Sequence, residues 1–246
     1  MTFILRNRSG ITNLPNLTTV GFIPHNAYSH LVLLDYLSAR LPDPIIASPN
    51  DRVRVRMVNN FRAALNNEFR PNQPDLTGVN YRLAFTTSYW SPPAHWDRSP
   101  AGARTYLTGA GFMALPNAAA MLYGRKSIEA VFNPAAKVLL YSPIAWYFGR
   151  GPEEQWFGAT QGRARAPYAF YDGSVQVLSA SQFNRGRNPN TGAVFSPGEL
   201  QFQGRPEWGE PVGFLLEGVH RMTATVGGLS GIDYGGGEVR WTPGAY

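Results

Sequence analysis

Residues 163–183 constrain the fold more than any other stretch of the chain, because they have the pattern of a β-hairpin. Two runs rich in aromatic and β-branched residues flank the pair Asp172-Gly173. Apolar residues alternate along both runs, as in a strand with one buried face. Asp-Gly is typical of a tight two-residue turn that needs positive φ. The sequence therefore predicts an antiparallel strand pair closed by Asp172 and Gly173.

Helical patterns precede this hairpin. Residues 26–41 have apolar residues at mostly helical spacing behind Asn26, a suitable N-cap. Residues 48–69 begin with Ser48-Pro49-Asn50-Asp51, a capping sequence with proline at the first helical position, and predict a second helix. The alternative for its start is a strand, because Val53 and Val55 alternate with arginines that oppose the helix dipole.

Further strands are expected on both sides of the hairpin. Alternation and β-rich composition predict strands at residues 80–90 and 138–148, with Pro143 bending the second or placing it at a sheet edge. Short strands are also expected at 213–216 and 220–226. The resulting fold class is α+β, with N-terminal helices packed on an antiparallel sheet and long Gly/Pro-rich loops.

Composition indicates one globular unit with ordered loops. The 246 residues include 26 Gly and 20 Pro, but aromatic residues (13%) are interleaved throughout, unlike in a disordered chain. We expect an extended arm at residues 1–24 and a single domain at 25–246 with a loop insertion near 184–210. Arg6, Arg8 and two prolines interrupt the first 24 residues, so they cannot span a bilayer. The chain is therefore expected to have no transmembrane segment of its own, and to be cytoplasmic or peripheral to a membrane complex.

Charge and cysteine content limit the classes of partner and site. The chain has no cysteine, which excludes disulfides and thiolate metal sites. Its net charge of +6 includes several arginine clusters, which either form solvated surface or attract an anionic surface. There is no motif for specific nucleic-acid binding.

The candidate chemistry is weak. The four histidines, at 25, 30, 95 and 220, lack metal-ligand spacing. The segment Gly228-Leu229-Ser230-Gly231 is followed by Ile232 where a nucleophile elbow needs glycine. Glu153, Glu154 and Asp172 could be glycosidase carboxylates, but nothing in the sequence fixes their separation and Asp172 already has a role in the turn. We expect no catalytic residue, no cofactor and no metal.

Two motifs in order suggest a family. Residues 133–140 (NPAAKVLL) and 170–175 (FYDGSV) resemble segments of the pseudopilin-like proteins of planctomycete-type bacteria that carry a prepilin-type processing-associated H-X9-DG motif. Residues 45–51 (IIASPND) are similar to the family's Cys-Pro-Ser-Asp segment without its cysteine, and Asn80-Tyr81 follows as in the family. Gly162 stands where the motif has its histidine, and the family's anchor helix has no counterpart.

The resemblance implies a non-catalytic structural subunit of a multisubunit filament, secretion apparatus or membrane-associated complex, bound to other protein subunits. A structural protein of a virion or lattice is one alternative, and a glycan-binding module with exposed Trp and Tyr is another. Aromatic residues and arginines in loops are enriched at protein interfaces. The candidate interface residues are Trp90, Trp96, Trp146, Trp156, Arg163 and Arg165.

Overall fold

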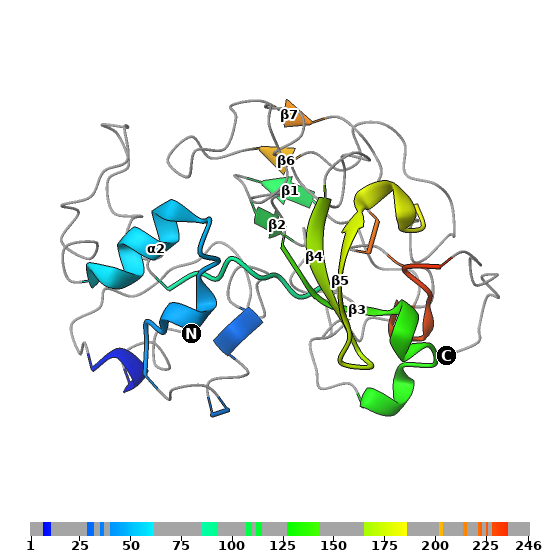
Figure 1. Ribbon diagram of the computed structural model, residues 1–246, viewed down its shortest axis with the longest axis horizontal. Helices are drawn as coiled ribbons and strands as arrows, with labels where there is room; N and C mark the ends of the chain where they lie inside the picture. The colour runs from blue at the N-terminus through cyan, green and yellow to red at the C-terminus, as the bar shows by residue number, and fades with distance from the viewer. Residues whose placement is uncertain are drawn as a thin grey trace. The chain divides into compact units, whose positions relative to one another are not determined.

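The computed structural model describes residues 7–10, 29–31, 35–36, 40–61, 85–92, 107–109, 112–114, 127–142, 165–185, 202–203, 214–215, 221–222, 225 and 228–235. The chain divides into two compact units (Figure 1). The first consists of residues 1–90 and 204–212, and the second of residues 91–203 and 213–246. Each is described by itself. The expected arm at 1–24 and the expected insertion near 184–210 lie mostly outside the described residues.

A three-stranded antiparallel sheet organises the second unit, in the order β3 (Val138–Tyr141), β4 (Arg165–Phe170), β5 (Val175–Ser179). Figure 1 shows β4 and β5 as the two arms of one hairpin. Five residue pairs join them, from Arg165 opposite Ser179 to Ala169 opposite Val175. The hairpin predicted from the sequence is therefore present. β3 ends at Tyr141, so the strand expected at 138–148 stops before Ser142; residues 143–148 lie outside the described residues.

The loop of this hairpin differs from the two-residue turn that Asp-Gly predicts. The Phe170 N–H donates to the Ser174 carbonyl at 2.9 Å, and the Gly173 N–H donates to the Phe170 carbonyl at 3.0 Å. The loop therefore has three residues, and Gly173 takes the left-handed conformation with φ of 85°. This is the pattern of a turn followed by a left-handed residue. The Asp172 Oδ1 accepts the Ser174 N–H at 2.9 Å, which stabilises the longer loop.

An aromatic core lies on one face of the sheet. Tyr168 and Phe170 alternate with half-buried residues along β4 and are fully buried. Phe183, just after β5, packs on both, with ring centroids 4.4 Å from Tyr168 and 6.5 Å from Phe170. Tyr234 completes the cluster at 5.5 Å from Phe183, where the two residues form an isolated β-bridge. Residues 228–235, called the C-terminal segment below, are thereby held against the sheet.

The first unit contains the helix α2 (Arg52–Asn59), so the helical interpretation of this segment is right and the alternative of a strand is wrong. Its N-cap is Asp51, whose side chain accepts the Arg54 N–H, so Pro49 lies before the helix and not in its first turn. Val55 and Val58 pack against Ile46 and Ala47. Ile46 is the last residue of a short 3-10 turn, η2 (Pro44–Ile46), and Ala47 follows it. Apolar contacts thus fix the helix on the preceding turn.

The strand expected at residues 80–90 is not formed in its described part, 85–90, apart from a single bridge residue at Trp90. Local polar groups compete for this backbone. The Ser88 N–H and the Thr87 hydroxyl both donate to the Ile46 carbonyl, each at 2.9 Å. The Tyr89 N–H in turn donates to the Thr87 hydroxyl at 3.1 Å. Side-chain hydrogen bonds of this kind favour an irregular path over a ladder.

Smaller elements complete the described chain. Two two-stranded antiparallel sheets pair β1 (Leu107–Gly109) with β2 (Phe112–Ala114) and β6 (Phe202–Gln203) with β7 (Phe214–Leu215). β7 falls in the strand expected at 213–216, whereas β1 and β2 were not expected. Arg221 and Met222 form a turn, not the strand expected at 220–226. The remaining 3-10 turns are η5 (Ile128–Ala130), η6 (Pro134–Ala136), η7 (Ala180–Gln182) and η9 (Gly228–Ser230).

The described residues thus combine a short helix with a three-stranded antiparallel sheet, a mixed α+β composition. Where the structure describes the segment 26–41, it has a 3-10 turn at 29–31, a turn at 35–36 and a bend at 40–41 in place of the continuous helix expected there; the rest of the segment lies outside the described residues. In the part of the chain that the structure describes, no helix has the length and apolarity needed to cross a membrane.

Candidate functional site

A buried ion pair lies where the C-terminal segment meets the start of β3. The Lys137 Nζ donates to the Asp233 Oδ1 at 3.0 Å, and neither side chain is exposed. The other carboxylate oxygen, Oδ2, accepts the Val138 N–H at 2.9 Å, and the Thr225 hydroxyl donates to Oδ1. Three donors therefore surround one carboxylate in the interior, which satisfies most of its hydrogen-bonding capacity.

The backbone holds this pair in place. The N–H groups of Asp233 and Tyr234 both donate to the Ala136 carbonyl, at 2.9 and 3.1 Å. The Asn184 N–H donates to the Asp233 carbonyl at 2.8 Å. Asp233 is thus fixed from two sides, by the chain before β3 and by the chain after β5.

Burial dominates the electrostatics of the pair. Desolvation lowers the pKa of Lys137 below its ordinary value, although the charge of Asp233 and its hydrogen bond act in the opposite direction. Burial, with a smaller contribution from the charge of Asp233, raises the pKa of Tyr171 to about 12. Burial thus favours the neutral form of the Lys137 amine more than water does for a solvated lysine.

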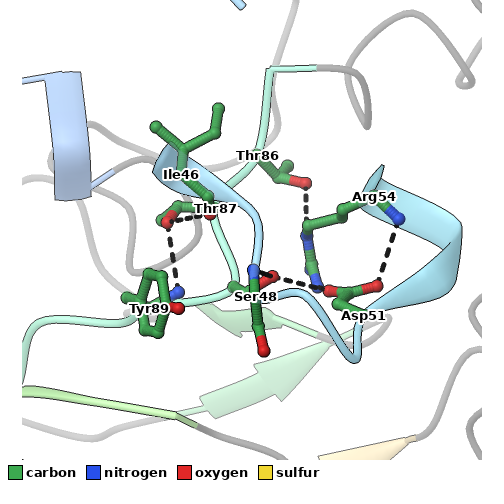
Figure 2. A network of polar contacts seen from close by, with 8 residues as sticks. Ile46, Ser48, Asp51, Arg54, Thr86, Thr87 and Tyr89 are labelled. Carbon is green, nitrogen blue, oxygen red and sulfur yellow. Dashed lines mark hydrogen bonds and ion pairs between the residues drawn. The ribbon is translucent and has the colours of Figure 1, made fainter. Parts of the chain in front are cut away.

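A second polar network lies in the first unit (Figure 2). The Arg54 side chain reaches between two partners: it pairs with the Asp51 carboxylate and donates through Nε to the Thr86 hydroxyl at 3.0 Å. The Ser88 hydroxyl donates to the Asp51 Oδ2 at 2.8 Å and accepts the Ser48 N–H at 2.9 Å. This network ties the cap of α2 to residues 86–88.

His30 is buried in the same unit, and neither of its ring nitrogens has a hydrogen-bond partner among the described residues. Burial, with a smaller contribution from the charge of Arg54, lowers the pKa of His30 to about 4, and the charge of Asp43 opposes this shift. His30 is therefore neutral near pH 7.

The strand β5 lies at one edge of the three-stranded sheet as the structure describes it. Among the described residues, no strand pairs with β5 on the side away from β4. The Phe170 N–H donates to the Ser174 carbonyl, so these two residues form a hydrogen-bonded pair of the ladder. Hydrogen-bonded and non-hydrogen-bonded pairs alternate along an antiparallel ladder, and the N–H groups of Gln176 and Leu178 therefore face β4. The amides of Val175 and Val177 face away from it. Their side chains are 67% and 44% exposed.

The site residues predicted from the sequence differ in whether they lie at the surface, in the interior or outside the described residues. Asp172 and Gly173 lie in the exposed loop of the hairpin, where the Ser174 N–H lowers the pKa of the Asp172 carboxyl. Arg165 is exposed at the start of β4. Trp90 is only 2% exposed, so its indole packs inside the chain itself. The other candidate interface residues, Trp96, Trp146, Trp156 and Arg163, lie outside the described residues.

In the part of the chain that the structure describes, no group of three or more acidic, histidine or cysteine side chains is placed to hold a metal ion. Glu153 and Glu154, the candidate carboxylates, lie outside it. No protein-family model matches the chain, and no curated protein or solved structure is similar to it at a significant level.

Sequence reasoning missed the two buried networks. Lys137 and Asp233 are separated by 96 residues, and neither stands in a motif that signals a charge partner. Lys137 lies within the family-like segment 133–140, but that resemblance concerns the strand and not its lysine. The pairing of Asp51 with Arg54 has a local signal, because residues three apart at the start of a helix lie side by side.

Proposed function

We propose that this protein is a non-catalytic structural subunit, similar in its globular part to pseudopilins, that assembles with other protein subunits through the edge of β5 that faces away from β4. The observation that carries the proposal is the character of that edge. Natural sheets protect exposed edges with charges, prolines or bulges. β5 (VQVLS) has no charge and no proline, and it exposes two valines.

The contacts between the two family-like segments support the resemblance on which this proposal rests. The Asp172 N–H donates to the Pro134 carbonyl at 3.3 Å, and the Tyr171 N–H donates to the Lys137 carbonyl at 3.1 Å. The segment 133–140 therefore packs directly on the Asp172-Gly173 loop, as expected when two motifs belong to one structural unit. The finer arrangement, helices packed on the sheet as in a pseudopilin ectodomain, is part of the proposal.

Further apolar surface in the same unit fits an assembling protein. Ile128 and Phe132, in the segment before β3, are 69% and 72% exposed. Large exposed apolar side chains that gather on one protein indicate interaction surfaces. A strand added at the β5 edge would form backbone hydrogen bonds with β5, and Val175 and Val177 would supply apolar contact.

The test measures association of the purified full chain by light scattering over a range of concentrations. We expect the wild type to form assemblies that dissociate on dilution. The double variant Val175→Lys/Val177→Lys should stay monomeric, because two charges on an edge strand oppose strand addition. The matched control is Asn59→Lys, which adds a charge at an exposed position of α2 and should associate like the wild type.

Two results would overturn the proposal. One is a monomer of 27.1 kDa at every concentration, both for the chain alone and for the chain purified from its source with any bound partner. The other is association that the β5 lysines leave unchanged.

A further inference from the structure

We propose that Lys137 and Asp233 form an intramolecular amide bond, so that the mature protein carries a covalent cross-link between the start of β3 and the C-terminal segment. The two reacting groups are in direct contact at 3.0 Å and completely buried. This inference rests on other residues than those of the proposed association edge, so either can fail without the other.

Proximity is the first argument. The backbone bonds from Asp233 and Tyr234 to the Ala136 carbonyl hold the carboxyl beside the lysine that follows Ala136. Reactants held in contact behave as if at very high effective concentration. The dry surroundings also favour the product, since an ion pair is costly to keep in the interior and an amide is neutral.

The donors around Asp233 suit the chemistry of amide formation. The Val138 N–H bonds Oδ2 at 2.9 Å, where the negative charge of a tetrahedral intermediate would develop. The Thr225 hydroxyl donates to Oδ1, the oxygen that must leave. Desolvation favours the neutral amine of Lys137, which is the nucleophilic form.

The reaction balances without any added reagent. A proton passes from the ammonium of Lys137 to the carboxylate of Asp233, and the neutral Nζ attacks Cγ. The new Nζ–Cγ bond forms and the Cγ–Oδ1 bond breaks. Oδ1 leaves as water with the proton of the acid and one proton of the amine. One amide and one water replace one ammonium and one carboxylate, and nothing is oxidised or reduced.

Intact-mass spectrometry of the folded full chain, denatured just before analysis, tests the proposal. We expect a mass below that of the sequence by one water molecule. Proteolysis should then give one branched peptide that joins Lys137 to Asp233. Lys137→Met, which replaces the amine by an uncharged thioether side chain of similar length, should have the full mass of its sequence. Thr225→Val should delay the loss of water.

Each other result counts against the cross-link. A wild type with the full sequence mass overturns it. A loss of water that persists in Lys137→Met also overturns it, because an exposed Asp-Gly pair such as Asp172-Gly173 can lose water by closing on its own backbone. Should Lys137→Met not fold, the branched peptide decides alone: its presence in wild-type digests supports the bond, and an unmodified Lys137 peptide contradicts it.

Discussion

A single buried histidine gives the first unit a defined response to acid. The folded state keeps His30 neutral down to its lowered pKa of about 4, whereas the unfolded chain takes up a proton near the ordinary value of 6.5. Between these values the unfolded state binds more protons, so stability falls as the pH falls. We expect His30 to cost the folded state about 3 kcal/mol by the lower end of this window.

Carboxylates also titrate in this range, so the measurement must be a comparison. The free energy of unfolding is measured by denaturant titration at several pH values for the wild type and for His30→Phe, which keeps a planar ring but cannot take up a proton. The wild type should lose more stability on acidification than the variant. Equal pH dependence in the two proteins would show that His30 does not titrate as its burial implies.

The hairpin loop depends on one glycine. Gly173 has φ of 85°, and a Cβ at this position would meet nothing within 4 Å. Gly173→Ala should therefore destabilise the protein through backbone strain alone, by about 1 kcal/mol. Gly173→Asn is the control, because asparagine tolerates the left-handed region better. Equal stability of the alanine variant and the wild type in denaturant titrations would contradict this conformation.

The helix α2 depends at its start on the buried carboxylate of Asp51. Asp51→Ala removes the cap and also the ion pair that this carboxylate makes with the Arg54 guanidinium, which is 3% exposed. Breaking a buried pair from one side costs about 3 kcal/mol or more. The exposed Arg52→Ala should change the unfolding free energy by less than about 0.5 kcal/mol. A small effect of Asp51→Ala in thermal or chemical unfolding would place that carboxylate at the surface.

Elements with a local cause could be predicted, and elements with a distant cause could not. Alternation and the Asp172-Gly173 pair predict the hairpin, since both signals lie in the segment itself. The three-residue loop was missed because it depends on hydrogen bonds to Ser174. Residues 85–90 have strand composition, but the Ile46 carbonyl binds their polar groups from far away in the sequence. The same limit applies to the contact between Lys137 and Asp233.

At the scale of the whole molecule, the net positive charge limits which surfaces could bring copies of the chain together. Copies with a net charge of +6 repel one another, so the association that we propose needs surface that carries little charge. The β5 edge is such a surface, and it belongs to a sheet whose strand β4 contributes to an aromatic core. A strand edge that is already ordered can add a strand without first paying the entropy of ordering it.

Hydrogen exchange at β5 tests the central claim most directly. Exchange of single backbone amides is measured by NMR or fragmentation mass spectrometry at a high and a low protein concentration. We expect the amides of Gln176 and Leu178, which face β4, to be protected at both. Those of Val175 and Val177 should be protected only at the high concentration. Equally fast exchange of these two amides at both concentrations, in a sample shown to be associated, would contradict assembly through this edge.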